Sequence, residues 1–175
     1  MLKEGLLTSV FKNKGEKNIA TNYRGITVLP VLNKVIETIL KVRINPAVRA
    51  TQNVTRRGFT AGSGLPNEAL PVEQINRETK DNNQEYELLL LDAKSSFDVV
   101  IPSHLMKWLY HTGIDDKHWT IIQSMHTNAT SAVKWNNQPT QQFNVLQGVR
   151  QGGILSTDLY KLYINPLLNI LETSS

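Results

Sequence analysis

The segment that most constrains this chain is Glu85–Val100, which reads EYELLLLDAKSSFDVV. Four consecutive leucines, Leu88 to Leu91, are followed at once by Asp92. A short continuous apolar run that stops at a polar residue is typical of a strand buried on both faces. We therefore expect a core strand at Leu88–Leu91, with Asp92 held at the end of a sheet, where binding sites often form.

A second carboxylate, Asp98, follows directly after Phe97. By itself, an aspartate at the end of a strand either is solvated or binds a cation, and carboxylates are mostly exposed. The segment DAKSSFDVV, however, resembles motif A of reverse transcriptases, particularly those of non-LTR retrotransposons and the related group II intron enzymes. The resemblance implies that Asp92 is catalytic and binds magnesium, that the backbone carbonyl of Ala93 supplies another oxygen, and that Phe97 lies under the nucleotide sugar.

Composition sets wider limits. The chain has 175 residues, of which 40% are hydrophobic, as is ordinary for one globular domain or part of one. It has no cysteine, which excludes disulfides and a cysteine nucleophile and fits an intracellular protein. We expect no membrane partner, because no segment is apolar and long enough to span a bilayer, and the start does not resemble a signal peptide.

Charge is unevenly distributed along the chain. Residues 1–57 contain 11 Lys and Arg against 3 acids, whereas residues 58–175 contain 8 against 12. This asymmetry predicts phosphate contacts on the first part and metal-binding carboxylates on the second. The alternative is a basic, solvated surface with no partner.

The block NYRGITVLPVLNKVIETIL predicts a short strand before Pro30 and a helix over about Asn33–Ile44. The apolar stripe of that helix is expected at Val35, Ile36, Ile39 and Leu40. The block resembles the fingers region of non-LTR reverse transcriptases, which implies that Arg24 and Lys34 approach the incoming triphosphate. The alternatives are an ion pair for Arg24 and simple solvation for Lys34.

Three further helices are expected. The first covers about Asn67–Asn82, with Ala69, Val72 and Ile75 buried. The second opens at Pro102 and closes at Gly113, with Leu105, Met106 and Leu109 facing inward. The third is capped by Asp115 or Asp116 and carries Trp119, Ile122 and Met125. We interpret the Asp115–Asp116 pair as a cap rather than a metal site. The spaced residues His104, His111, His118 and His126 are not expected to bind zinc, because no other ligand stands near them.

Residues Ser131–Val145 predict a β-hairpin with its turn at Asn137-Gln138-Pro139. The sequence GVRQGGILST then leads through glycines into an apolar helix, an arrangement that can bring backbone close to a ligand. It resembles motif B of the same reverse transcriptases, which implies that Gln151 and Gly152 lie against the nascent base pair and the template. Thr157 stands where the family usually has proline, and Pro166 is expected to kink the helix.

Together these blocks predict an α+β fold, the fingers and partial palm of a right-hand polymerase, with about 1–84 mainly fingers and about 85–175 mainly the first half of the palm. The Asp92 strand would lie in an antiparallel palm sheet packed on helices, without the motif C hairpin and the thumb. The expected function is that of a fragment of an RNA-directed DNA polymerase from a mobile element, using two Mg²⁺ ions, an RNA template, a DNA primer and deoxynucleoside triphosphates. We expect the chain alone to be inactive; the alternative is a non-catalytic remnant that binds nucleic acid through its basic first third.

Overall fold

The computed structural model describes residues 3–53, 58, 62 and 65–173. The chain divides into two compact units, one made of Met1–Gln52 with Ser95–Ser175 and the other of Asn53–Lys94. Sheet and helices both occur, with five α-helices among the described residues, so the predicted mixture of helix and sheet is confirmed.

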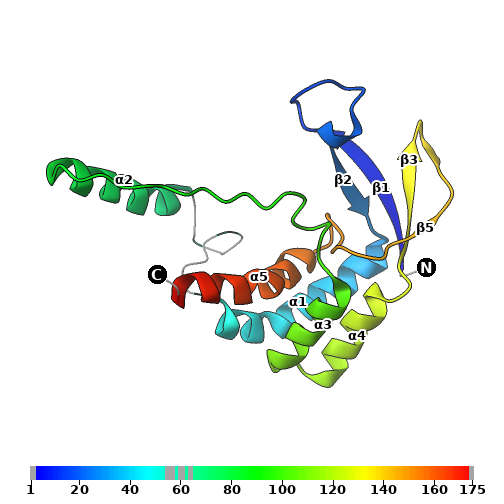
Figure 1. The fold of residues 1–175 in the computed structure, drawn as a ribbon. Helices are drawn as coiled ribbons and strands as arrows, with labels where there is room; N and C mark the ends of the chain where they lie inside the picture. Colours follow the sequence, from blue (N-terminus) through cyan, green and yellow to red (C-terminus); the bar gives the residue numbers. More distant parts are fainter. Residues whose placement is uncertain (1–2, 54–57, 59–61, 63–64, 174–175) are drawn as a thin grey trace. The chain divides into compact units, whose positions relative to one another are not determined.

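The sheet of the first unit combines strands from the start of the chain with strands from its last third (Figure 1). Its strands are β1 (Glu4–Phe11), β2 (Tyr23–Val28), β3 (Thr130–Trp135), β4 (Gln138–Pro139) and β5 (Phe143–Asn144). Strand β1 pairs antiparallel with β2, with Leu6 opposite Val28, and parallel with β3, with Leu6 opposite Ala132. The sheet is therefore mixed, and β1, which the sequence did not predict, is its central connection.

The predicted hairpin is confirmed, but its turn was placed wrongly. Strands β3 and β4 pair with Trp135 opposite Gln138, so the turn residues are Asn136 and Asn137. Both have positive φ, at 48° and 61°. Asparagine tolerates this left-handed conformation, which two-residue hairpin turns require. Pro139 instead lies in the short edge strand, where a missing N–H is tolerated.

Four helices pack beside the sheet and form the core of the first unit (Figure 1). They are α1 (Val31–Thr51), α3 (Pro102–His111), α4 (Asp116–His126) and α5 (Ser156–Thr173). Leu105 and Leu109 from α3, Ile122 from α4 and Leu159 from α5 are almost completely buried there. Helix α1 continues through Pro46 to Thr51, so its predicted end at about Ile44 was wrong, and Pro166 lies inside α5.

Helices α3 and α4 agree with the sequence prediction. Pro102 stands at the first turn of α3, and Gly113 follows the helix with a φ of +72°. The side chain of Asp115 accepts a hydrogen bond from the backbone N–H of Lys117 at 2.8 Å and so caps α4. Within the described part of the chain, no helix is long and apolar enough to cross a membrane.

For α1, the helix is confirmed but its predicted apolar stripe is partly wrong. Ile36 and Leu40 do pack on the core, whereas Val35 and Ile39 are about half-exposed. The buried face instead contains two polar residues, Asn33 and Glu37, in line with Leu40, Ile44 and Val48. The helix is rotated from the expected orientation, and Glu37 has hydrogen-bond partners on its inner side.

The second unit contains α2 (Leu65–Asp81), which confirms the predicted helix. Its predicted buried residues, Ala69, Val72 and Ile75, are exposed. The predicted core strand is also wrong: Leu88–Leu91 is not in a strand, and Leu90 is 82% exposed. A strand requires a hydrogen-bonded partner, and none of the described strands pairs with this segment. The predicted antiparallel sheet containing the Asp92 strand is therefore not formed in the described part of the chain.

Candidate functional site

The loop of residues 147–155, which leads into α5, contacts the turn at Phe97 and Asp98 and the strand β2. The N–H of Gly148 donates to the carbonyl of Val100 at 2.7 Å, and the N–H of Val149 donates to that of Phe97 at 2.8 Å. Gly148 has a φ of +91°, and a Cβ there would lie 3.1 Å from the carbonyl oxygens of Phe97 and Asp98. Backbone hydrogen bonds thus join this loop to the turn that contains Phe97 and Asp98.

The same loop lies against the free edge of β2. The N–H of Thr27 donates to the carbonyl of Gln151 at 2.7 Å. Gly152 has a φ of +116°, and a Cβ there would stand 2.6 Å from the carbonyl oxygen of Thr27. Only glycine fits this close approach without a shift of the backbone. Gln151 and Gly152 therefore lie directly beside the strand that carries Arg24.

Arg24 is exposed on β2, and the described residues offer it no carboxylate partner within ion-pair distance. Its predicted alternative, an ion pair, is therefore not seen in this part of the chain. Lys34 is exposed near the start of α1 and likewise forms no ion pair among the described residues. Arg24 lies on the strand that contacts the loop through Thr27, but among the described residues no contact joins the side chain of Arg24, or Lys34, to the loop.

Phe97 is partly buried against the core and is stacked on Tyr160 of α5. The ring centroids are 5.0 Å apart and the ring planes are inclined by 24°. Val100, three residues later, is fully buried. Because both sides of this short turn are anchored, the position of the Phe97 ring is determined by packing as well as by the loop.

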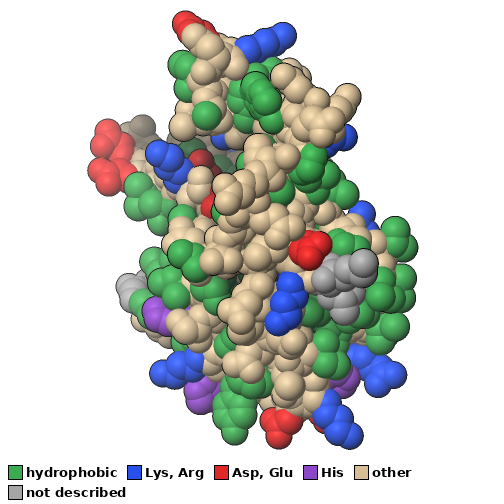
Figure 2. Space-filling view, turned by 90° about the vertical axis from the view of Figure 1, so that its right-hand side faces the viewer, with side chains coloured by type: hydrophobic (Ala, Val, Ile, Leu, Met, Phe, Trp, Pro, Cys, Tyr) green, Lys and Arg blue, Asp and Glu red, His purple; other side chains and the backbone are tan. Residues whose placement is uncertain are grey.

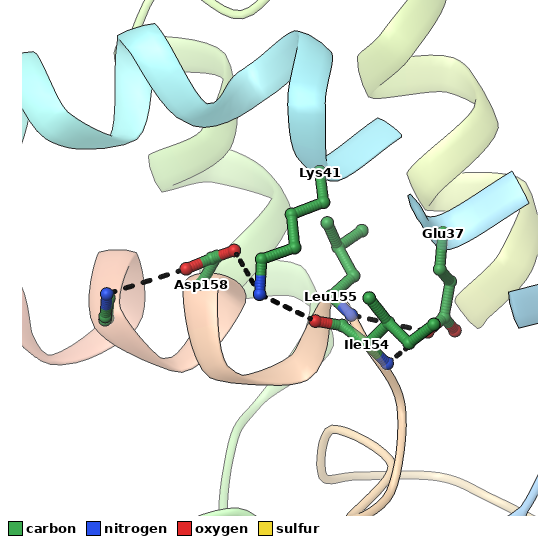
Figure 3. Close-up of polar contacts among 6 residues, drawn as sticks. Glu37, Lys41, Ile154, Leu155 and Asp158 are labelled. Atoms are coloured by element: carbon green, nitrogen blue, oxygen red, sulfur yellow. Dashed lines mark hydrogen bonds and ion pairs between the residues drawn. The ribbon is translucent and has the colours of Figure 1, made fainter. Parts of the chain in front are cut away.

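The sequence prediction missed Glu37, whose carboxylate contacts the loop from α1 (Figure 3). Its Oε2 accepts hydrogen bonds from the backbone N–H groups of Ile154, at 2.5 Å, and Leu155, at 3.3 Å. Its Oε1 accepts a hydrogen bond from Asn33 Nδ2 at 3.3 Å. The only signal in the sequence was that Glu37 shares helical spacing with Leu40 and Ile44, and the stripe expected at Val35 and Ile39 pointed to a different face.

A second polar contact joins α1 and α5 one helical turn further on (Figure 3). Lys41 Nζ lies 3.5 Å from Asp158 Oδ2 and donates to the carbonyl of Ile154 at 3.4 Å. Asp158 Oδ1 lies 3.6 Å from Lys161 Nζ. Asp158 is only 6% exposed, so burial leaves these ion pairs less screened by solvent than surface pairs. Asp158 stands in the first turn of α5, where negative charge is favourable.

Arg150 also holds the loop in place. Its Nη2 donates to the carbonyl of Lys3 at 2.7 Å, and its own carbonyl accepts from Ser156 Oγ at 2.7 Å. Burial lowers the pKa of the Arg150 guanidinium, and the nearby Glu37 carboxylate opposes that shift. Burial also lowers the pKa of His126, against its hydrogen bond to the Ile122 carbonyl, and the positive charge of Arg150 lowers it further.

A pocket of about 170 Å³ opens between the sheet and the loop. Gly25 and Thr27 of β2, Ser131 of β3, and Asp98 and Gln151 contribute to its walls. The pocket therefore lies where the two motif segments meet the sheet.

Some of the basic side chains in the described part of the first third are engaged in local contacts. Two of its lysines are used locally: Lys12 Nζ donates to the carbonyl of Thr21 at 2.9 Å, and Lys17 Nζ lies 5.8 Å from the centroid of the Phe11 ring. On the face shown in Figure 2, Lys and Arg side chains are dispersed rather than gathered. The predicted phosphate contacts of this region stay a prediction.

Comparison with known proteins agrees with this arrangement. Residues 11–175 match the family described as reverse transcriptase (RNA-dependent DNA polymerase). The chain belongs to the reverse transcriptase family. This confirms the predicted resemblance to reverse transcriptases of non-LTR retrotransposons.

Two relatives of this reverse transcriptase chain are much longer than it is. It is 23% identical over 95% of its length to a retrovirus-related Pol polyprotein from the type-1 retrotransposable element R2 of Popillia japonica. It is 28% identical over 92% of its length to a probable RNA-directed DNA polymerase from transposon X-element of Drosophila melanogaster. The chain spans 23% of the first of these relatives and 18% of the second.

Reverse transcriptases act on nucleotide substrates with a nucleic-acid template and primer, and they generally use divalent metal ions. Asp92 and Ala93 belong to the second unit, and both are exposed there. Over the described ranges, no group of three or more His, Cys, Asp or Glu side chains could hold a metal ion. Magnesium requires several hard oxygen ligands. The described residues do not by themselves fit a metal site.

Proposed function

We propose that this chain is the nucleotide- and template-binding part of an RNA-directed DNA polymerase of a mobile element. The observation that carries the proposal is the hydrogen bond from Thr27 N–H to the Gln151 carbonyl. It joins the strand of Arg24 to Gln151 and Gly152, which stand at the positions that the family resemblance assigns to the nucleotide. The family match over residues 11–175 supports the same function.

Each proposed role follows from the chemistry of the side chain. The guanidinium of Arg24 can bind phosphate oxygens with two parallel hydrogen bonds, and Lys34 would add a positive charge near the triphosphate. The flat ring of Phe97 would lie under the sugar and disfavour a 2′-hydroxyl. Gln151 and Gly152 would contact the base pair, since the absence of a side chain at Gly152 permits close approach.

Asp92 is the proposed catalytic carboxylate, and the carbonyl of Ala93 is a further proposed oxygen ligand for Mg²⁺, the proposed ion. These two groups supply fewer ligands than magnesium needs. We therefore propose that the 175-residue chain does not extend a primer by itself. The right-hand arrangement of fingers and palm is likewise proposed from the family resemblance.

A second candidate is a non-catalytic remnant that only binds nucleic acid. It is favoured by the lack of a group of three metal ligands among the described residues. The two candidates differ in what Asp92 does. In a longer protein that carries this segment and extends primers, Asp92→Ala should abolish extension; in a remnant, it should leave salt-dependent RNA binding nearly unchanged.

The direct test is binding of a deoxynucleoside triphosphate, supplied with Mg²⁺, to the purified chain. Arg24→Ala should weaken binding by about tenfold or more, because a charge-assisted contact to phosphate is worth roughly 1.5–3 kcal/mol. The matched control is Arg77→Ala, which removes an exposed arginine that pairs with Glu73 on α2. Equal binding by the Arg24 variant and the unaltered chain would refute the proposed role of Arg24. Primer extension by the unaltered chain would refute its proposed inactivity.

A further inference from the structure

We propose that Glu37 is a positioning residue for the nucleotide site: its carboxylate holds the loop so that Gln151 and Gly152 keep their place against β2. The inference rests on the proposed function for its nucleotide readout, but the position of the loop is testable without any nucleotide. Glu37 is separated from this loop by more than a hundred residues along the chain and contacts it only in the folded structure.

The first step concerns the start of α5. The residues directly before a helix have N–H groups with no partner within the helix, and a carboxylate bound there also lies near the positive end of the helix dipole. Glu37 Oε2 accepts from the N–H groups of Ile154 and Leu155, the two residues directly before Ser156. Glu37 as a residue is 5% exposed, so water cannot readily take its place.

The residues between the contacts of Thr27 and Glu37 form a short segment. Gln151 is held on one side by Thr27 N–H, and Ile154 is held on the other by Glu37. Between them, the N–H of Gly153 donates to the carbonyl of Arg150 at 2.9 Å, which closes the turn. The segment Gln151–Gly153 is therefore short and bound at both ends, so that movement of the Glu37 anchor must be transmitted to Gln151 and Gly152.

The third step is that α1 binds both polar groups of one peptide residue. Glu37 accepts from the N–H of Ile154, and Lys41, one turn later on the same helix face, donates to its carbonyl (Figure 3). Lys41 also pairs with Asp158 in the first turn of α5. Two side chains of one rigid helix thus set both the position and the orientation of the peptide groups at Ile154.

The free energy of burying the Glu37 carboxylate also bears on its role. A buried carboxylate pays a desolvation penalty, and an apolar residue of similar size would stabilise a helix interface as well or better. A charged acceptor instead makes one arrangement of the loop much more favourable than the alternatives. In any other arrangement, the carboxylate and the two N–H groups would have no hydrogen-bond partners. The placement of Glu37 is therefore better explained by positioning than by stability.

The test uses Glu37→Gln in the full chain, with NMR measurement of backbone amide shifts. An amide side chain keeps the shape of Glu37 but removes its charge. We expect shift changes at Ile154 and Leu155 and also at Thr27, Gln151 and Gly152. Binding of a deoxynucleoside triphosphate with Mg²⁺ should weaken by at least about tenfold, since small misplacements of a binding group have large effects.

Two control variants separate positioning from loss of stability. Ile44→Val shortens a buried side chain on the same helix and should lower the melting temperature without changing either the Gln151 and Gly152 shifts or nucleotide affinity. Glu73→Gln makes the same chemical change at an exposed carboxylate of α2. If Glu37→Gln does not fold, Lys41→Met tests the same anchor, because it removes the contact to the Ile154 carbonyl from a partly exposed side chain.

The outcomes are distinct. Shift changes confined to Ile154 and Leu155 would overturn the inference, as would an equal loss of affinity in Ile44→Val. If the unaltered chain does not bind the nucleotide, the proposed function fails, while the shifts of Thr27, Gln151 and Gly152 still decide whether Glu37 positions the loop.

Discussion

Gly152 is a single residue that decides whether the loop can lie against β2. Its φ is +116°, and a Cβ would stand 2.6 Å from the carbonyl oxygen of Thr27. The sequence indicated a glycine-rich approach to a ligand, and in the folded chain the nearest group is this protein's own strand. Gly152 therefore allows the loop to pack against β2, in addition to its proposed role beside the nucleotide.

Gly152→Ala should lower the free energy of unfolding by about 2–4 kcal/mol, because it combines an unfavourable φ with a steric overlap. Gly113→Ala is the matched control: its φ is +72°, but a Cβ there has no neighbour within 4 Å. Gly113→Ala should therefore lower the free energy of unfolding by only about 1–2 kcal/mol, the part that comes from the unfavourable φ. Urea unfolding of the two variants measures the difference, and equal losses would show that the contact with Thr27 is not tight.

His126 makes stability depend on pH. Burial and the nearby Arg150 lower its pKa in the folded state from the ordinary value of 6.5. Below pH 6.5 the unfolded chain therefore binds a proton more readily, so stability should be full above that pH and fall as the pH drops toward the folded-state pKa. His126→Gln should remove this part of the acid sensitivity, whereas His104→Gln, at an exposed position on α3, should not. Thermal unfolding between pH 5 and 8 measures the pH dependence of stability. Identical pH profiles of the melting temperature for both variants would contradict the prediction.

Helix α1 shows what can be predicted at the scale of an element and what cannot. Its apolar content and the proline before it were enough to place a helix there. They were not enough to choose which face is buried, since Val31, Val35, Ile39 and Val42 form an alternative apolar face that is exposed. The choice depends on Glu37 and its partners in a segment far along the chain.

The two faces of α1 can be compared directly by mutation. Ile39→Ser should change the free energy of unfolding by no more than about 0.5 kcal/mol, because Ile39 is 53% exposed. Leu40→Ala should cost about 2–5 kcal/mol, because Leu40 is 3% exposed and belongs to the core. Denaturant unfolding of both variants is the measurement. A large loss for Ile39→Ser would mean that the side of the helix that carries Val35 and Ile39 is also buried.

For the whole molecule, the exposed leucines of the second unit are a hazard. Leu89 and Leu90 are 80% and 82% exposed in a run of four. Exposed apolar segments that can pair as strands promote association between chains. We therefore expect the chain to be poorly soluble because of these residues, although the predicted buried strand was wrong.

Leu89→Lys combined with Leu90→Lys should raise the concentration at which the chain remains monomeric. Gln84→Lys is the control, because it adds charge to the same segment without removing a leucine. Light scattering over a concentration series measures association. If the control improves solubility as much as the double variant, net charge rather than the leucine run limits solubility.

The sequence by itself determined the family, the order of the motif segments and most helix boundaries. These properties are local: Pro102 and Gly113 delimit α3, and Asp115 caps α4 with a bond to a residue two positions away. Motif residues are recognised by type and spacing, which need no knowledge of packing. For the same reason, Arg24, Phe97, Gln151 and Gly152 could be named as candidates before their surroundings were known.

Only the tertiary structure decided the pairing of β1 with β3, the buried face of α1 and the clamp of Glu37 on the loop. Each of these depends on residues more than a hundred positions apart, whose meeting is set by the packing of the whole unit. The Leu88–Leu91 run fails as a predicted strand for the same reason. Apolar residues can favour a strand, but its formation requires a partner strand, and none of those described pairs with it.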